Sequence, residues 1–241
     1  MTDAVEPYAP PRALAPDVHV VDGEWQGTTF RRRMTVLRLA SGDLALHSPI
    51  WLREADLAWL DGLGRVAFVV APNRFHGSEA HRYAARYPDA RVLVSPPAAA
   101  EVRRGGRVDG LLPDAWPAAA RDEVDVLEFR GTRLLAEQVF FHRGSRTLVL
   151  TDLVFNLQVE VRGLEGAFLR WNRIDRRFGP SKLFKWVFVN DTAAALASYR
   201  QLMAWDFDRV IMSHGDVLER GGKAAMKTGF EYVFGERAAL A

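Results

Sequence analysis

The sequence predicts an α/β domain in which two β-sheets pack together and helices cover their outer faces, a four-layer αβ/βα sandwich. Two observations support this prediction. The chain begins with strand-like alternation of apolar and polar residues, and it continues with helical patterns that alternate with short, wholly apolar runs. Residues 1–241 contain no evident internal linker and no repeat of fixed period, so we expect one domain.

The first part of the chain has the pattern of antiparallel strands. Residues 17–22 alternate in polarity, and residues 33–39 and 44–47 are two further strands joined by a Ser-Gly-Asp turn, as in a hairpin. Residues 1–16 precede them as a Pro-rich N-terminal arm.

The next part predicts helices between buried strands. Residues 66–71 (VAFVVA) and 91–95 (RVLVS) are continuous apolar runs of the kind found in strands that are covered on both faces. Helical spacing or helix boundary residues mark residues 49–60, 77–87 and 96–104.

The second half repeats this alternation of strands and helices. Three strands are predicted at residues 123–129, 134–141 and 147–151, and a fourth, RVIM, at residues 209–212. Asp191 is placed to cap a helix that runs through Trp205, and another helix closes the chain near Gly235.

Composition limits the chemistry that the protein can perform. The chain of 241 residues has no Cys, so any metal must be bound by Asp, Glu or the six His. The formal charge of +2 gives little support for nucleic-acid binding. We expect a cytoplasmic protein, because we find neither a signal peptide nor an apolar run of 18 residues. The sequence gives no indication of oligomeric state.

Polar clusters follow four of the predicted strands, where loops can carry functional groups without disturbing the core. They are residues 73–81, His142, Asp152, and His214 with Asp216. A single histidine in such a position is more often structural than functional. The coincidence of four clusters favours a common site.

The order of these clusters resembles the metallo-β-lactamase superfamily over roughly residues 18–235. The most specific segments are FFHRGSRTLVLTDLVFN at residues 140–156 and RVIMSHGD at residues 209–216. The resemblance implies a metal-dependent hydrolase fold, with His142, Asp152 and His214 as ligands.

The early His-x-His-x-Asp-His motif of that superfamily is degenerate here. The corresponding residues are Arg74-Phe75-His76-Gly77-Ser78-Glu79, which match at His76 when it is aligned with the second histidine. A cation at Arg74 cannot ligate a metal, so the usual two-ion site is not expected. Three or four ligands suffice for one Zn²⁺ or Fe²⁺ ion. The predicted metal ligands are His76, His142, Asp152 and His214, with Glu79, His81 and Asp216 as weaker candidates. Asp152 and His214 are also the predicted catalytic residues.

A basic and aromatic segment at residues 157–188 lies between Asp152 and His214, where the resemblance implies an active-site insertion. We expect Arg173 and Arg177, together with Arg74, to bind an anionic small-molecule substrate. Two other interpretations stay open for the segment: an amphipathic structure with solvated cations, or peripheral membrane contact.

Two functional hypotheses follow. The first is a metal-dependent, hydrolase-like enzyme with one Zn or Fe ion. The second is a non-catalytic protein of the same fold, without metal, that binds an anionic small molecule or a membrane headgroup in the old active-site cavity. No residue selects a substrate, because this fold carries many reactions.

Overall fold

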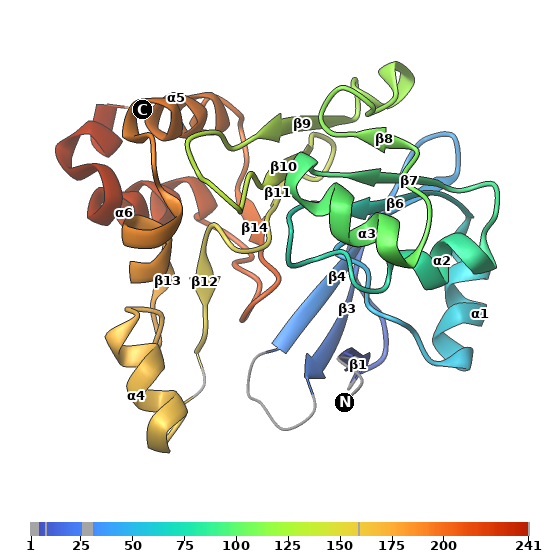
Figure 1. Cartoon of the computed structure of the whole chain (residues 1–241), viewed down its shortest axis with the longest axis horizontal. Coiled ribbons are helices and arrows are strands. Elements are labelled where there is room, and N and C mark those ends of the chain that lie inside the picture. Colours follow the sequence, from blue (N-terminus) through green and yellow to red (C-terminus); the bar gives the residue numbers. More distant parts are fainter. Residues whose placement is uncertain (1–4, 8, 26–30, 159, 241) are drawn as a thin grey trace. The chain divides into compact units, whose positions relative to one another are not determined.

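The protein forms two compact units, Met1–Val124 and Asp125–Ala241, in a computed structural model that describes residues 5–7, 9–25, 31–158 and 160–240 (Figure 1). Each unit contains a β-sheet with helices packed on it, as the α/β prediction requires. The single domain over residues 1–241 stays a prediction.

The first unit contains an eight-stranded sheet in the order β1-β3-β4-β5-β6-β7-β8, with β2 also paired to β3. Its strands are β1 (Val5–Pro7), β2 (Arg12–Ala15), β3 (Val18–Trp25), β4 (Arg31–Arg38), β5 (Asp43–His47), β6 (Arg65–Ala71), β7 (Arg91–Val94) and β8 (Gly110–Leu111). Its helices are α1 (Glu54–Leu63), α2 (Ala80–Arg86) and α3 (Ala99–Gly105), with 3₁₀ turns η1 (Pro96–Ala98) and η2 (Ala118–Ala120).

The pairing in this sheet changes from antiparallel to parallel at β5. Strands β3, β4 and β5 form the predicted antiparallel meander, and β5 to β8 pair in parallel with helical connections. β6 is buried on both faces over six of its seven residues, as its apolar sequence predicts. The predicted N-terminal arm instead contributes β1 and β2, and its residues 1–4 and 8 lie outside the described part of the chain.

The second unit contains a four-stranded sheet in the order β14-β11-β10-β9 and a two-stranded sheet of β12 and β13. Its strands are β9 (Val124–Glu128), β10 (Gln138–His142), β11 (Thr147–Val149), β12 (Phe155–Asn156), β13 (Phe178–Gly179) and β14 (Arg209–Ile211). Its helices are α4 (Gly163–Trp171), α5 (Thr192–Met203) and α6 (Gly222–Phe234), with a π-helical turn η3 (Phe184–Phe188) and a 3₁₀ segment η4 (Gly235–Leu240).

Aromatic side chains are prominent in the core of the second unit, to which α5 and α6 contribute. These two helices are drawn in orange and red in Figure 1. The rings of Tyr199 and Phe230 stack with centroids 4.7 Å apart, and Phe184 meets Phe230 edge-on at 5.9 Å. Asp191 caps α5 as predicted, because its carboxylate accepts hydrogen bonds from the backbone of Ala193 and Ala194.

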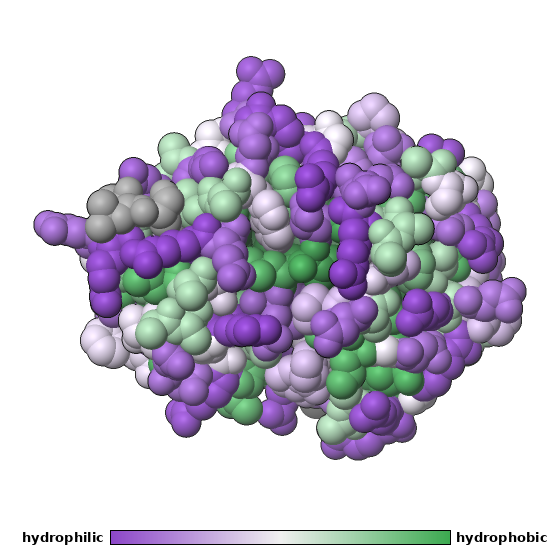
Figure 2. Space-filling view, turned by 90° about the horizontal axis from the view of Figure 1, so that it is seen from above, coloured by the Kyte–Doolittle hydropathy of each residue, from purple (hydrophilic) through white to green (hydrophobic). Residues whose placement is uncertain are grey.

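Charged and polar side chains dominate the face of the molecule in Figure 2, and apolar residues appear there as patches between them. None of the helices in the described part of the chain has the length and apolar character needed to cross a bilayer.

Candidate functional site

Two parallel strands of the second unit bring Asp152 and His214 together. β11 and β14 lie side by side, and the backbone N–H of Leu150 extends their pairing by donating to the carbonyl of Ile211 at 2.8 Å. Asp152 follows the end of β11 by the same three residues that separate His214 from the end of β14. The Nε2 atom of His214 lies 3.1 Å from Oδ1 of Asp152, with the two side chains 10% and 15% exposed. This nearly buried pair is the structural centre of the candidate site.

The strand β12 fixes the loop that carries His214. The imidazole stacks on the ring of Phe155, with centroids 5.6 Å apart and planes inclined by 13°. The backbone N–H of Asn156 donates to the carbonyl of His214 at 3.3 Å, and its side-chain amide donates to the carbonyl of Asp216 at 2.9 Å. Gly215 has a φ of 104°, and a Cβ there would collide with the carbonyl of Asn156. The close approach of these two backbones therefore requires glycine.

The buried Glu137 holds the loop that carries Asp152. Its carboxylate accepts hydrogen bonds from the backbone N–H groups of Thr151 at 2.6 Å, Asp152 at 2.8 Å and Leu153 at 3.1 Å. Burial, and then the nearby charge of Asp152, raise the pKa of Glu137 to about 7, against the opposing effect of these hydrogen bonds. Glu137 therefore holds the backbone of the loop that carries Asp152.

Sequence analysis did not predict a role for Glu137. The available signal was an acidic residue directly before the buried strand β10, a position in which an unpaired carboxylate would be costly. β10 runs antiparallel to β11, so the start of β10 and the end of β11 meet at one edge of the sheet. Glu137 and Asp152 lie at that edge.

The same strand direction corrects the prediction for His142. His142 ends β10 and pairs with Thr147, the first residue of β11, five residues before Asp152. At about 3.3 Å per residue, this places it on the order of 16 Å along the sheet from Asp152. Its Nδ1 lies 2.8 Å from Oγ of Ser145 in the hairpin turn. His142 therefore does not ligate a metal together with Asp152 and His214.

His76, in the first unit, is buried and oriented by Ser48. The Nδ1 atom of its ring lies 2.7 Å from Oγ of Ser48, a residue with a φ of 57°. A non-glycine residue in the left-handed region is uncommon. The loop before His76 turns at Asn73, whose side chain accepts a hydrogen bond from the backbone of Phe75 at 2.8 Å.

The weaker candidates have other contacts. Glu79 is buried and pairs with Arg82 at 3.3 Å, and Nδ1 of His81 lies 2.8 Å from the carbonyl of Ser78. Asp216 is exposed, and it contributes its backbone rather than its carboxylate to the contact with Asn156 described above. These three residues stay predictions as metal ligands.

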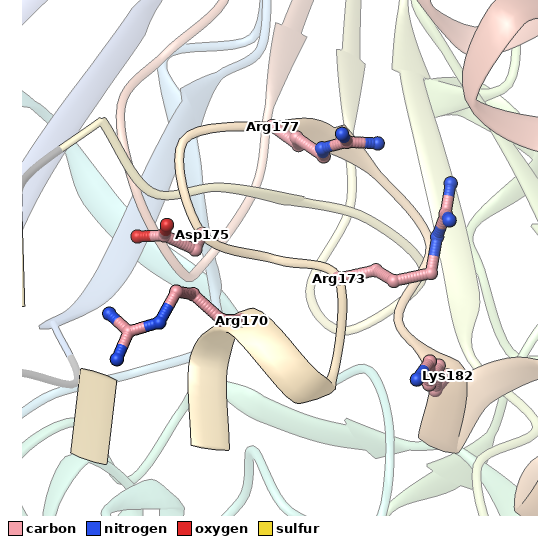
Figure 3. Close-up of a pocket in the computed structure, with 5 residues that line it drawn as sticks. All are labelled: Arg170, Arg173, Asp175, Arg177 and Lys182. Atoms are coloured by element: carbon pink, nitrogen blue, oxygen red, sulfur yellow. The ribbon is translucent and has the colours of Figure 1, made fainter. Parts of the chain in front are cut away.

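The predicted anion-binding arginines lie in both units. Arg173 and Arg177 of the second unit line a pocket of about 400 Å³ together with Arg170, Asp175 and Lys182 (Figure 3). Arg74 is an exposed residue of the first unit.

Comparisons with known proteins bear on the family and the fold. The model of a family described as "Domain of unknown function (DUF4336)" matches residues 27–165, more than half of the chain. A comparison with curated proteins finds no match.

Solved metallo-β-lactamases have a similar fold. A metallo-β-lactamase from Pontibacter korlensis is 14% identical, with a TM-score of 0.60 over 89% of this chain and 95% of that one. One from Hirschia baltica is 13% identical, with a TM-score of 0.59 over 96% and 98% of the two chains. The DIM-1 metallo-β-lactamase gives a TM-score of 0.62 at 10% identity over 97% and 99%. The predicted α/β sandwich of the metallo-β-lactamase type is thereby confirmed, and identities this low carry no information about the reaction.

Proposed function

Because the chain belongs to the DUF4336 family and has the metallo-β-lactamase fold, we propose that it is a metal-dependent, hydrolase-like enzyme with a single Zn²⁺ or Fe²⁺ ion. The observation that carries this proposal is the pair formed by Asp152 and His214 beyond the ends of two parallel strands. Such strand ends are where α/β proteins place ligand-binding and catalytic groups.

The donor set fits a divalent transition metal. We propose Asp152 and His214 of the second unit as ligands, one carboxylate and one imidazole. His76, an imidazole of the first unit that the sequence predicts as a ligand, stays a predicted third donor. Neutral imidazole and carboxylate are ordinary ligands for Zn²⁺ and Fe²⁺, and three protein ligands are typical of a catalytic site that keeps a position for substrate.

The surroundings of each donor support this set. The contact of Ser48 with Nδ1 of His76 fixes the orientation of that ring, which is the usual arrangement for a metal-binding histidine that ligates through Nε2. Within the second unit, Phe155 contacts the ring of His214 and Glu137 binds the backbone of the Asp152 loop. Donors held in this way lose little conformational freedom when an ion binds.

We propose one ion rather than two. Arg74 stands where the superfamily motif has a histidine, and a guanidinium can neither ligate nor tolerate a nearby second cation. The chemistry that one divalent ion supplies in such a site is Lewis-acid polarisation of a substrate oxygen. Asp152 can contribute a carboxylate oxygen as ligand or proton acceptor.

Metal content tests the proposal. Protein purified without added metal should contain about one equivalent of Zn or Fe by elemental analysis, and a chelator should lower its melting temperature, because an ion that binds only the folded state stabilises it. Metal-free preparations whose melting temperature responds to neither chelator nor added Zn²⁺ or Fe²⁺ would remove the basis for this function. If the protein does contain metal, hydrolysis of ester, phosphodiester and lactam test substrates by the metal-loaded protein would identify the reaction class.

A further inference from the structure

Residues 163–188, which we call the 163–188 face, expose an unusual amount of apolar surface. Five of the eight large hydrophobic side chains that are exposed in the described part of the chain lie between residues 164 and 187. Isolated exposed apolar residues need no explanation, but a concentration in one segment marks an interaction surface.

The apolar side chains of α4 form a stripe on its outer side. Leu164, Phe168 and Trp171 follow the i, i+4, i+7 spacing of one helix face, and Leu164 is 93% and Trp171 55% exposed. On the buried side, Leu169 packs inward, and Gly166 lies against the backbone of Val161, where a Cβ would collide with its carbonyl. The helix therefore packs on the second unit through Gly166 and Leu169 and exposes its large apolar side chains.

Cations surround a pocket in the same segment. Arg170, Arg173, Arg177 and Lys182 line the pocket of about 400 Å³, with Asp175 as the acidic residue in its lining. In the view of Figure 3, Arg173, Arg177 and Lys182 lie on one side and Arg170 and Asp175 on the other. Asp175 pairs with Arg176, whereas none of the four cations forms an ion pair with a carboxylate among the described residues. A positive pocket of this kind favours an anionic occupant.

Contacts between rings and cations join the pocket to the exposed aromatics. Nζ of Lys182 lies 5.2 Å from the ring centre of Trp171, and the guanidinium of Arg173 lies 4.3 Å from that of Tyr232. Trp186, which is 71% exposed, lies beside Lys185 and contacts the Tyr232 hydroxyl at 3.3 Å. The apolar stripe and the cations therefore belong to one continuous surface.

We propose that the 163–188 face docks on an anionic lipid bilayer, with α4 inserting its apolar stripe at the interface and the pocket cations binding lipid phosphates. Exposed Trp beside Lys and Arg is the composition expected for interfacial helices. The segment has six cations against two carboxylates, which complements a negative membrane surface. A second copy of this chain is a poorer occupant, because a two-fold contact would bring the same cations together.

Vesicle sedimentation with the full-length protein tests the proposal. The protein should sediment with phosphatidylcholine vesicles that contain phosphatidylglycerol and stay in solution with phosphatidylcholine alone. High salt should weaken binding, because it screens the attraction. Binding should also shift the tryptophan emission to the blue, and a variant with both Trp171→Phe and Trp186→Phe should lose that shift.

Matched variants locate the binding surface. Leu164→Asp, and Arg173→Glu combined with Arg177→Glu, should each reduce vesicle binding at least about tenfold. Leu111→Asp and the pair Arg103→Glu with Arg104→Glu change exposed residues of the first unit in the same way and should bind vesicles normally. Circular dichroism melts identify any variant that is unfolded.

Three outcomes would overturn the proposal. They are failure to sediment with anionic vesicles at low salt, equal loss of binding in the control variants, and stabilisation by inorganic phosphate without vesicle binding. The last would identify a soluble anion as the occupant of the pocket. Metal content is measured in parallel, so that failure here is distinct from failure of the proposed metal site.

Discussion

The carboxylate of Glu137 accepts a hydrogen bond from the backbone N–H of Asp152 at 2.8 Å, and two neighbouring N–H groups bind the same carboxylate. A proposed metal ligand is thus held by a fully buried acid that lies 15 residues earlier in the chain.

Replacing Glu137 should destabilise the protein according to the acceptors that remain. Glu137→Ala leaves two buried N–H groups and one partly buried N–H group without their acceptor and should lower the free energy of unfolding by about 3 kcal/mol or more. Glu137→Gln keeps an amide oxygen as acceptor and should cost less. Urea unfolding of both variants measures the difference, and equal losses would contradict the role assigned to this carboxylate.

The corrected position of His142 gives a control for metal binding. Asp152→Asn and His214→Gln should each lower the metal content of the purified protein by at least about tenfold. His142→Gln should leave it unchanged, because that ring contacts Ser145 at the other end of the sheet. If all three variants lose metal equally, general destabilisation rather than ligation is responsible.

The glycine after His214 should be intolerant of a side chain. Gly215→Ala adds a methyl group against the carbonyl of Asn156 at a φ of 104° and should cost about 2 kcal/mol or more in unfolding free energy. Gly42→Ala is the control, because Gly42 has a similar φ of 84° but a methyl group there would meet open space. Its loss of unfolding free energy, about 1 kcal/mol, therefore measures the cost of the backbone conformation alone. Thermal melts and metal content of the two variants compare these effects. A metal content in Gly215→Ala that equals that of Gly42→Ala would show that the approach of Asn156 does not position His214.

The pH dependence of stability should report His19. Burial lowers the pKa of this histidine below its ordinary 6.5, and a hydrogen bond with the backbone of Pro16 opposes the shift only in part. Between the lowered pKa and 6.5 the unfolded chain binds more protons than the folded one, so stability is complete above pH 6.5 and falls as the pH drops through this interval. His19→Gln does not titrate and should lose less stability on acidification, as measured by melting temperature against pH. Parallel pH profiles for the two proteins would show that His19 does not contribute, and metal content should be the same in both.

The sequence predicted the strands of the site better than it predicted the residues at their ends. Apolar runs identify β11 and β14 of the second unit, and β6 of the first unit, because burial on both faces leaves a local pattern. Asp152 and His214 follow two of these strands, and their proximity could be expected from that position alone.

The prediction for His142 and the omission of Glu137 have one cause: the position of each residue relative to Asp152 depends on strand pairing between segments that are separated in the sequence. His142 and Glu137 lie at opposite ends of β10, and whichever of them faces Asp152 depends on the direction of that strand relative to β11. A periodic pattern does not record strand direction. Similarly, the predicted helix at residues 49–60 begins only at Glu54, since Ile50 is buried without helical backbone. Over residues 49–60, buried residues before the helix continue the apolar spacing of the helix itself, so the spacing does not show where the helix begins.

The parallel pairing of β11 and β14 also determines when the site can form during folding. Thr147 and Arg209, which begin the paired segments, are 62 residues apart in the sequence, and α4 and α5 lie between them. Helices can form locally and early, but a pairing over this separation must first meet the entropic cost of closing a long loop. Metal affinity should therefore appear late in refolding, after most of the helical circular dichroism signal, which makes it a measure of complete assembly of the second unit.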